Sequence, residues 1–84
     1  MNIRFDDPVM PLYQSHKKVR ALKISDFKDN TMYFQDPRFG PKKVNRDWAA
    51  KHDPKKGGYY VVYADGYESY SPAKAFEEGY KLIK

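Results

Sequence analysis

The strongest constraint on the fold lies in the last third of the chain, where residues 59–80 read YYVVYADGYESYSPAKAFEEGY. Residues 59–63 are a run of β-forming side chains, and residues 67–70 form a second run after a short break. The break contains Asp65 and Gly66, and glycine readily adopts the positive φ that a tight turn needs. The segment therefore predicts an antiparallel β-hairpin.

The register of this hairpin depends on the length of its loop. A loop of three residues places Tyr63 opposite Tyr67, whereas a loop of two residues places Ala64 there and exchanges the faces of one strand. We favour the longer loop, because Asp65 then lies in a type I turn and Gly66 in the adjacent bulge.

A helix is predicted to follow the hairpin. Ser71 is suited to cap it, and Pro72 to its first position, where a missing N–H has no cost. Gly79 is expected to end or loosen this helix. Along the predicted helix and beyond Gly79, apolar side chains recur at three- and four-residue spacing. They give one stripe, formed by Ala73, Phe76, Tyr80 and Ile83.

A second hairpin is predicted nearer the start of the chain. Residues 16–25 (HKKVRALKIS) favour a strand, although the adjacent Ala21 and Leu22 interrupt the alternation and leave a short helix as the alternative. The turn-rich residues 25–30 follow, and residues 31–36 are again rich in β-forming side chains.

Between the two hairpins we expect a loop and a short helix. Residues 36–43 contain two prolines and a glycine, which are typical of a loop. Residues 44–52 favour a helix with Asn45 as its N-cap, Trp48 as its packing anchor and a stop before Pro54.

The predicted order is β-β-α-β-β-α in a single α+β domain over residues 15–84. Residues 1–14 are predicted to be an extended arm, because Pro8 and Pro11 oppose regular structure; a free tail is the alternative. Phe5, Val9, Met10 and Leu12 are its candidate packing residues. Four short strands and two short helices indicate a small curled antiparallel sheet of SH3-like character. A chain of 84 residues buries only about 60–65% of its unfolded surface, so we expect a thin core.

Composition excludes several classes of protein. The chain has no cysteine, which excludes disulfides and thiolate metal sites. No apolar run approaches the ~20 residues of a membrane span, and MNIRFDDPVM lacks the apolar core of a signal peptide. We therefore expect a cytoplasmic protein with no membrane partner. Aromatic residues make up 17% of the chain, which argues against disorder.

The residues give little support to catalysis. The two histidines are His16 and His52, and neither a GxSxG nor a GxxxxGK[ST] motif is present. The neighbouring Glu77 and Glu78 point in different directions on a helix and form no acid–base pair. We expect a non-enzymatic protein without a cofactor or metal.

Two features favour binding. Residues 42–58 hold six basic and two acidic residues, a local charge of +4 that suits phosphate contacts, with a solvated lysine-rich surface as the alternative. The candidate nucleic-acid-binding residues are Lys42, Lys43, Arg46, Lys51, Lys55 and Lys56.

The second feature is aromatic. Six of the eight tyrosines fall within residues 59–80, and two short helices cannot cover both faces of the hairpin. Some rings should reach the surface, where tyrosine is a strong contact residue for proteins and a stacking platform for bases. Cross-strand packing in a thin core is the alternative. The candidate partner-binding residues are Tyr63, Tyr67 and Tyr70.

The pattern YxDGYxSxSPxxxFExxY at residues 63–80, together with YQSHKKVRALKI, resembles small uncharacterised proteins encoded by tailed bacteriophages and prophages. The resemblance covers roughly residues 12–24 and 54–83. It implies a virus-encoded protein that acts in the bacterial cytoplasm, and it carries over no active site.

The leading functional hypothesis is a non-enzymatic phage- or prophage-encoded protein that engages a host or phage macromolecule, with a protein as the favoured partner, through the tyrosine-rich hairpin and the basic segment. The alternative is a nucleic-acid-binding accessory protein that uses residues 42–56 for phosphate contacts. A third hypothesis, a protein that sequesters a small molecule or nucleotide, requires a deep cavity lined by tyrosine and a basic side chain.

Overall fold

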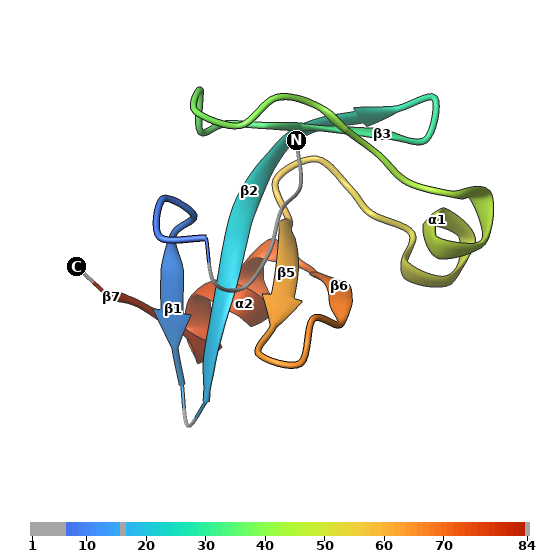
Figure 1. Cartoon of the computed structure of the whole chain (residues 1–84). Coiled ribbons are helices and arrows are strands. Elements are labelled where there is room, and N and C mark those ends of the chain that lie inside the picture. The colour runs from blue at the N-terminus through green and yellow to red at the C-terminus, as the bar shows by residue number, and fades with distance from the viewer. Residues whose placement is uncertain (1–6, 16, 84) are drawn as a thin grey trace.

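The computed structural model describes residues 7–15 and 17–83, and over this part of the chain it confirms the α+β class with seven strands and two helices (Figure 1). In chain order these are β1 Leu12–Gln14, β2 Lys18–Lys28, β3 Thr31–Phe34, β4 Lys42–Lys43, α1 Arg46–His52, β5 Tyr59–Tyr63, β6 Glu68–Ser71, α2 Ala73–Gly79 and β7 Lys81–Ile83. Phe5 of the predicted arm and His16, where the first strand was expected to begin, lie outside the described residues.

Strand β2 is the centre of the fold, and it belongs to two parts of one antiparallel sheet (Figure 1). Its first half pairs with both β1 and β5, and its second half pairs with β3. The register shifts between Ile24 and Asp26, where the strand passes from one part of the sheet to the other. Irregularities of this kind bend a strand and increase its twist, and the sheet formed here is open rather than closed.

Three short strands were missing from the predicted order. Strand β1 forms from the last residues of the predicted arm and lies between β2 and β7. Strand β4 lies at the end of the predicted loop and pairs with β3. Strand β7 follows the second helix. Each has only two or three residues, which is too short for alternation to be recognised in the sequence.

The first hairpin is confirmed, but its turn is shorter than predicted. Strand β2 continues to Lys28, which pairs with Thr31. The turn needs only Asp29 and Asn30, whose φ values of 53° and 55° suit a two-residue turn with both residues left-handed. Residues 25–28 therefore belong to the strand.

The second hairpin has the three-residue loop that the sequence favoured. Val62 pairs with Glu68, and Tyr63 donates its backbone N–H to the carbonyl of Tyr67 at 2.9 Å. Gly66 has a φ of 92° and donates to the carbonyl of Tyr63 at 2.9 Å. This register places Tyr63 and Tyr67 opposite each other on one face.

Both helices form close to where they were predicted. Asn45 caps α1, because its side chain accepts the N–H of Trp48 at 2.7 Å, and Asp53 ends the helix in a left-handed conformation. The capping role expected of Ser71 was wrong: pairing with Tyr59 holds Ser71 in strand β6, and α2 has no side-chain cap.

Helix α2 ends at Gly79 as predicted, so the last part of the proposed apolar stripe does not exist. Tyr80 has extended backbone angles, and Ile83 lies in β7. The stripe that faces the sheet is reduced to the first part of the helix, where Phe76 is the buried residue.

The core has two layers, one on each face of the β2–β5 pair. Alternate side chains of β5 divide between them: Tyr60 and Val62 enter the first, and Tyr59 and Val61 enter the second. The first core cluster consists of Met10, Leu22, Ile24, Met32, Phe39, Tyr60 and Val62. The second core cluster consists of Val19, Ala21, Tyr59, Val61 and Phe76. Helix α1 covers the first through Trp48, and α2 covers the second through Phe76.

This arrangement explains the interrupted alternation in β2. Ala21 and Leu22 are both buried, because each belongs to a different cluster and both faces of the strand are covered. The strand prediction is therefore confirmed.

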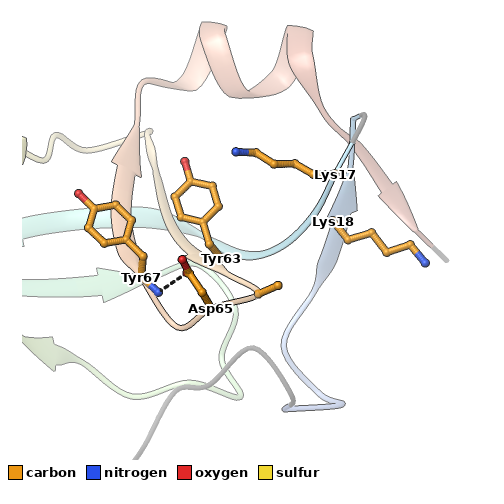
Figure 2. Close-up of a pocket in the computed structure, with 6 residues that line it drawn as sticks. Lys17, Lys18, Tyr63, Asp65 and Tyr67 are labelled. Carbon is orange, nitrogen blue, oxygen red and sulfur yellow. Dashed lines mark hydrogen bonds between the residues drawn. The ribbon is translucent and has the colours of Figure 1, made fainter.

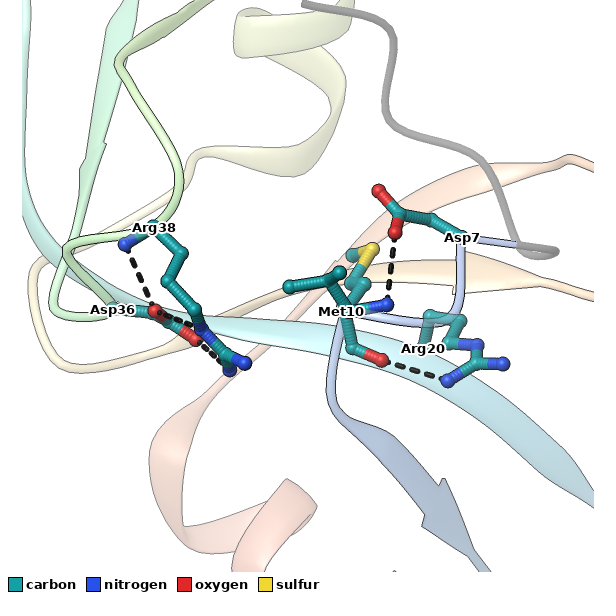
Figure 3. Close-up of polar contacts among 6 residues, drawn as sticks. Asp7, Met10, Arg20, Asp36 and Arg38 are labelled. Carbon is teal, nitrogen blue, oxygen red and sulfur yellow. Dashed lines mark hydrogen bonds and ion pairs between the residues drawn. The ribbon is translucent and has the colours of Figure 1, made fainter.

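The described part of the predicted arm packs against β2 (Figure 3). Met10 is only 1% exposed, and its carbonyl accepts a 2.7 Å hydrogen bond from Nη1 of Arg20. The expectation that Val9 packs was wrong, because its side chain is exposed. Nearby, Arg38 donates to both carboxylate oxygens of Asp36, at 2.9 and 2.7 Å, and so lowers the pKa of that carboxyl.

Gly58, between α1 and β5, lies directly against the ring of Tyr70. A Cβ built on Gly58 would overlap atoms of that ring. We expect Gly58→Ala to lower the free energy of unfolding by about 1–3 kcal/mol, measured by chemical denaturation, because the half-buried ring must shift. Gly40→Ala is the matched control, since a Cβ there meets nothing within 4 Å. Equal losses in the two variants would show that the ring moves aside at no cost.

Candidate functional site

Tyr63 and Tyr67 form a stacked pair beside the turn of the second hairpin, and we call them the tyrosine pair. Their ring centroids are 5.7 Å apart and the ring planes differ by 14°. The pair exists because the three-residue loop sets the two residues opposite each other. Tyr63 is half-buried, whereas Tyr67 is 45% exposed.

A hollow of about 680 Å³ opens on one side of the tyrosine pair (Figure 2). Its lining consists of Lys17, Lys18, Tyr63, Ala64, Asp65 and Tyr67. The lysines reach it because β2 pairs with β5, with Val19 opposite Tyr63. Lys17 extends toward the Tyr63 ring, with Nζ 4.5 Å from the ring centroid, which is a cation–π contact. We call this the first hollow.

A second hollow, of about 420 Å³, lies between the hairpin and α1. Its lining consists of Lys42, Lys43, Val44, Asn45, Trp48, Gly66, Tyr67 and Glu68. Tyr67 lines both hollows, so its ring stands between them. Lys51 approaches the same ring, with Nζ 3.4 Å from the Tyr67 hydroxyl.

The carboxylates at this site are held by the protein itself. Asp65 accepts the backbone N–H of Tyr67 at 2.9 Å. Glu68 accepts the hydroxyl of Tyr60 at 2.6 Å and lies 3.6 Å from Nζ of Lys42. Four other basic side chains of the site form no ion pair with another described residue, and we call them the flanking lysines: Lys17, Lys18, Lys43 and Lys51.

Trp48 and His52 border the site from α1. The indole Nε1 of Trp48 donates to the carbonyl of Glu68 at 3.1 Å, which ties the helix to β6. The His52 ring lies 4.5 Å from the Trp48 ring. Burial, followed by the charge of Lys51, lowers the pKa of His52, so this imidazole is neutral at pH 7.

Tyr70 does not join the tyrosine pair. It lies opposite Tyr60, and its ring therefore packs on the first core cluster. Its ring also covers Gly58. Of the three tyrosines chosen as partner-binding candidates, the structure brings together Tyr63 and Tyr67.

The basic segment is divided in a similar way. Lys42 and Lys43 line the second hollow, and Lys51 reaches Tyr67. The remaining candidates, Arg46, Lys55 and Lys56, line neither hollow. Lys55 forms an ion pair with Asp53 at 3.0 Å.

Lys17 and Lys18 were missed as site residues. They belong to the run HKK before the first strand, and the sequence carries no local sign that they approach the hairpin. Their position follows from the pairing of β2 with β5, which are separated by 30 residues of chain.

The described residues show no arrangement that would hold a metal: none of their His, Asp and Glu side chains gather in groups of three or more. In the same part of the chain, no helix combines the length and apolar character needed to cross a membrane.

Comparison with known proteins gives no relative. No protein-family model matches the chain, and neither does any curated protein or solved structure. The resemblance to phage-encoded proteins therefore stays a prediction.

Proposed function

We propose that this chain is a non-enzymatic binding protein, encoded by a phage or prophage, that engages a macromolecule of the host or of the phage in the host cytoplasm. The observation that carries the proposal is the tyrosine pair, whose Tyr67 ring stands between two hollows bordered by lysines. A partner would meet the rings of Tyr63 and Tyr67 first and the flanking lysines around them.

The pair has the properties of an interface anchor. Tyrosine offers a large amphipathic surface and loses little conformational entropy when it is fixed. Here the turn hydrogen bonds fix the backbone that carries the two rings, and the rings stack on each other. Because the rings are preorganised, fixing their side chains on binding costs little free energy.

Charge favours a negatively charged partner. The chain has a net charge of +5, and the two carboxylates of the site are engaged by hydrogen bonds within the protein. An acidic protein surface and a nucleic acid both fit this description. The open shape of the first hollow supports a macromolecule over a sequestered small molecule, since small-molecule sites enclose most of the ligand.

The proposal is tested by affinity capture from a bacterial lysate at low salt. Immobilised wild-type protein should retain a partner that the double variant Tyr63→Ala, Tyr67→Ala loses. Tyr33→Ala is the matched control, because Tyr33 also has a lysine over its ring, with Nζ of Lys28 at 5.9 Å, but lines neither hollow. Equal retention by all three proteins would exclude the tyrosine pair as the contact.

A further inference from the structure

The partner of this surface can be named by its chemistry. We infer that single-stranded nucleic acid binds across the tyrosine pair, with bases against the rings and phosphates beside the flanking lysines. This inference rests on the proposed function and specifies the partner of the same site. It requires ring faces that a base can reach and cations on both sides of the rings.

The two rings stack on each other, so each keeps one outer face, and a lysine ammonium lies near each ring; the His52 ring also lies beside Tyr67, with the ring centroids 6.3 Å apart. Lys17 lies over Tyr63 at 4.5 Å and Lys51 over Tyr67 at 5.7 Å. An exposed cation–π contact is weaker than the stacking of a base on an aromatic side chain. A base can therefore replace each ammonium, and the long side chain then carries the displaced charge to a phosphate.

The cations lie on both sides of the rings. Lys17 and Lys18 border the first hollow, and Lys43 borders the second. Figure 2 shows Lys18 directed outward, away from the tyrosine pair. A strand whose bases stack on Tyr63 and Tyr67 thus meets positive charge before and after the rings, as in sites that track a single strand without reading its sequence.

An acidic protein segment would pair with the lysines and pack on the rings, but it would find few aliphatic side chains beside them. Among the described residues, the aliphatic side chains that line the two hollows are Ala64 and Val44. Beyond the aromatic side chains, a protein partner would find little aliphatic surface in which to anchor its own side chains. Duplex DNA is also a poorer fit, because its bases are already stacked and paired.

The direct test is fluorescence anisotropy with a labelled oligothymidylate of about 12 nucleotides, within the usual range of site sizes. We expect Tyr63→Ala and Tyr67→Ala each to weaken binding roughly 5- to 100-fold, because each removes one stacking platform. Tyr67→Phe keeps the ring and should bind like the wild type, as should Tyr33→Ala. Thermal melts of each variant verify that it is folded.

Charge is tested separately. Lys18→Glu should weaken binding more than Lys74→Glu, since Lys74 lies on α2 and lines neither hollow. If four lysines meet phosphates, the affinity should fall about 50-fold between about 50 and 200 mM salt.

Several results would overturn the inference: no binding of the oligonucleotide at low salt, a loss in Tyr33→Ala equal to that in Tyr67→Ala, or equally tight binding of a duplex or of polyglutamate. A partner that is captured through the tyrosine pair and survives nuclease treatment would keep the proposed function and reject nucleic acid. Absence of both oligonucleotide binding and lysate capture would reject both.

Discussion

Phe76→Ala should lower the free energy of unfolding by about 3–5 kcal/mol, the usual loss for a buried aromatic ring. The ring is 1% exposed and is the only part of α2 that is buried among the described residues. It stacks on Tyr59 at 4.3 Å and on Tyr80 at 4.6 Å, and Tyr13 meets its edge at 4.8 Å. Removing it leaves a cavity in the second core cluster and detaches the helix from the sheet. Chemical denaturation measures the loss.

Glu78→Ala, on the same helix, is the matched control. Glu78 is exposed, so this variant should change the stability by less than about 0.5 kcal/mol. A loss below about 1 kcal/mol for Phe76→Ala would mean that α2 adds little to the fold, contrary to the packing seen here.

Tyr60→Ala should have an effect of similar size, about 3–5 kcal/mol, on the other face of the sheet. Tyr60 is fully buried, and its ring lies 5.8 Å from Phe34 and 6.4 Å from Trp48. Burial, together with the hydrogen bond to Glu68, raises the pKa of its hydroxyl, which therefore stays protonated and donates at all ordinary pH values.

Tyr60→Phe separates the ring from the hydroxyl. It keeps the packing and removes only the hydrogen bond to Glu68, whose carboxylate retains Lys42 nearby. We expect a loss of about 1–2 kcal/mol, measured under the same conditions as Tyr60→Ala. If both variants lose the same amount, the hydrogen bond rather than ring packing stabilises the first core cluster.

The sequence predicted the elements that depend on neighbours along the chain. Asn45 reaches the N–H of Trp48 three residues away, and Gly66 provides the positive φ of the second hairpin. The prediction from neighbouring residues was wrong at Ser71. Its pairing with Tyr59 keeps it in strand β6, so it does not cap α2.

Features that depend on pairing between strands far apart in the sequence could not be predicted from the sequence. Strand β1 exists because β2 and β7 lie on either side of it, and its three residues have no pattern of their own. The candidate site shows the same division: the stacking of Tyr63 on Tyr67 follows from the loop length, whereas the approach of Lys17 depends on the pairing of β2 with β5. The register of β5 and β6 must be known before Tyr70 can be assigned to one face of the sheet.

The position of β2 has a consequence for dividing the chain. A cut in residues 53–58 would leave β2 on one fragment with β1 and β3, and would place β5 on the other. The first fragment would then expose the edge of β2 that pairs with β5, and it would hold only part of each core cluster. The second fragment would lack β2, the strand with which its hairpin pairs. Neither piece is self-sufficient, so the smallest folding unit of this protein contains both.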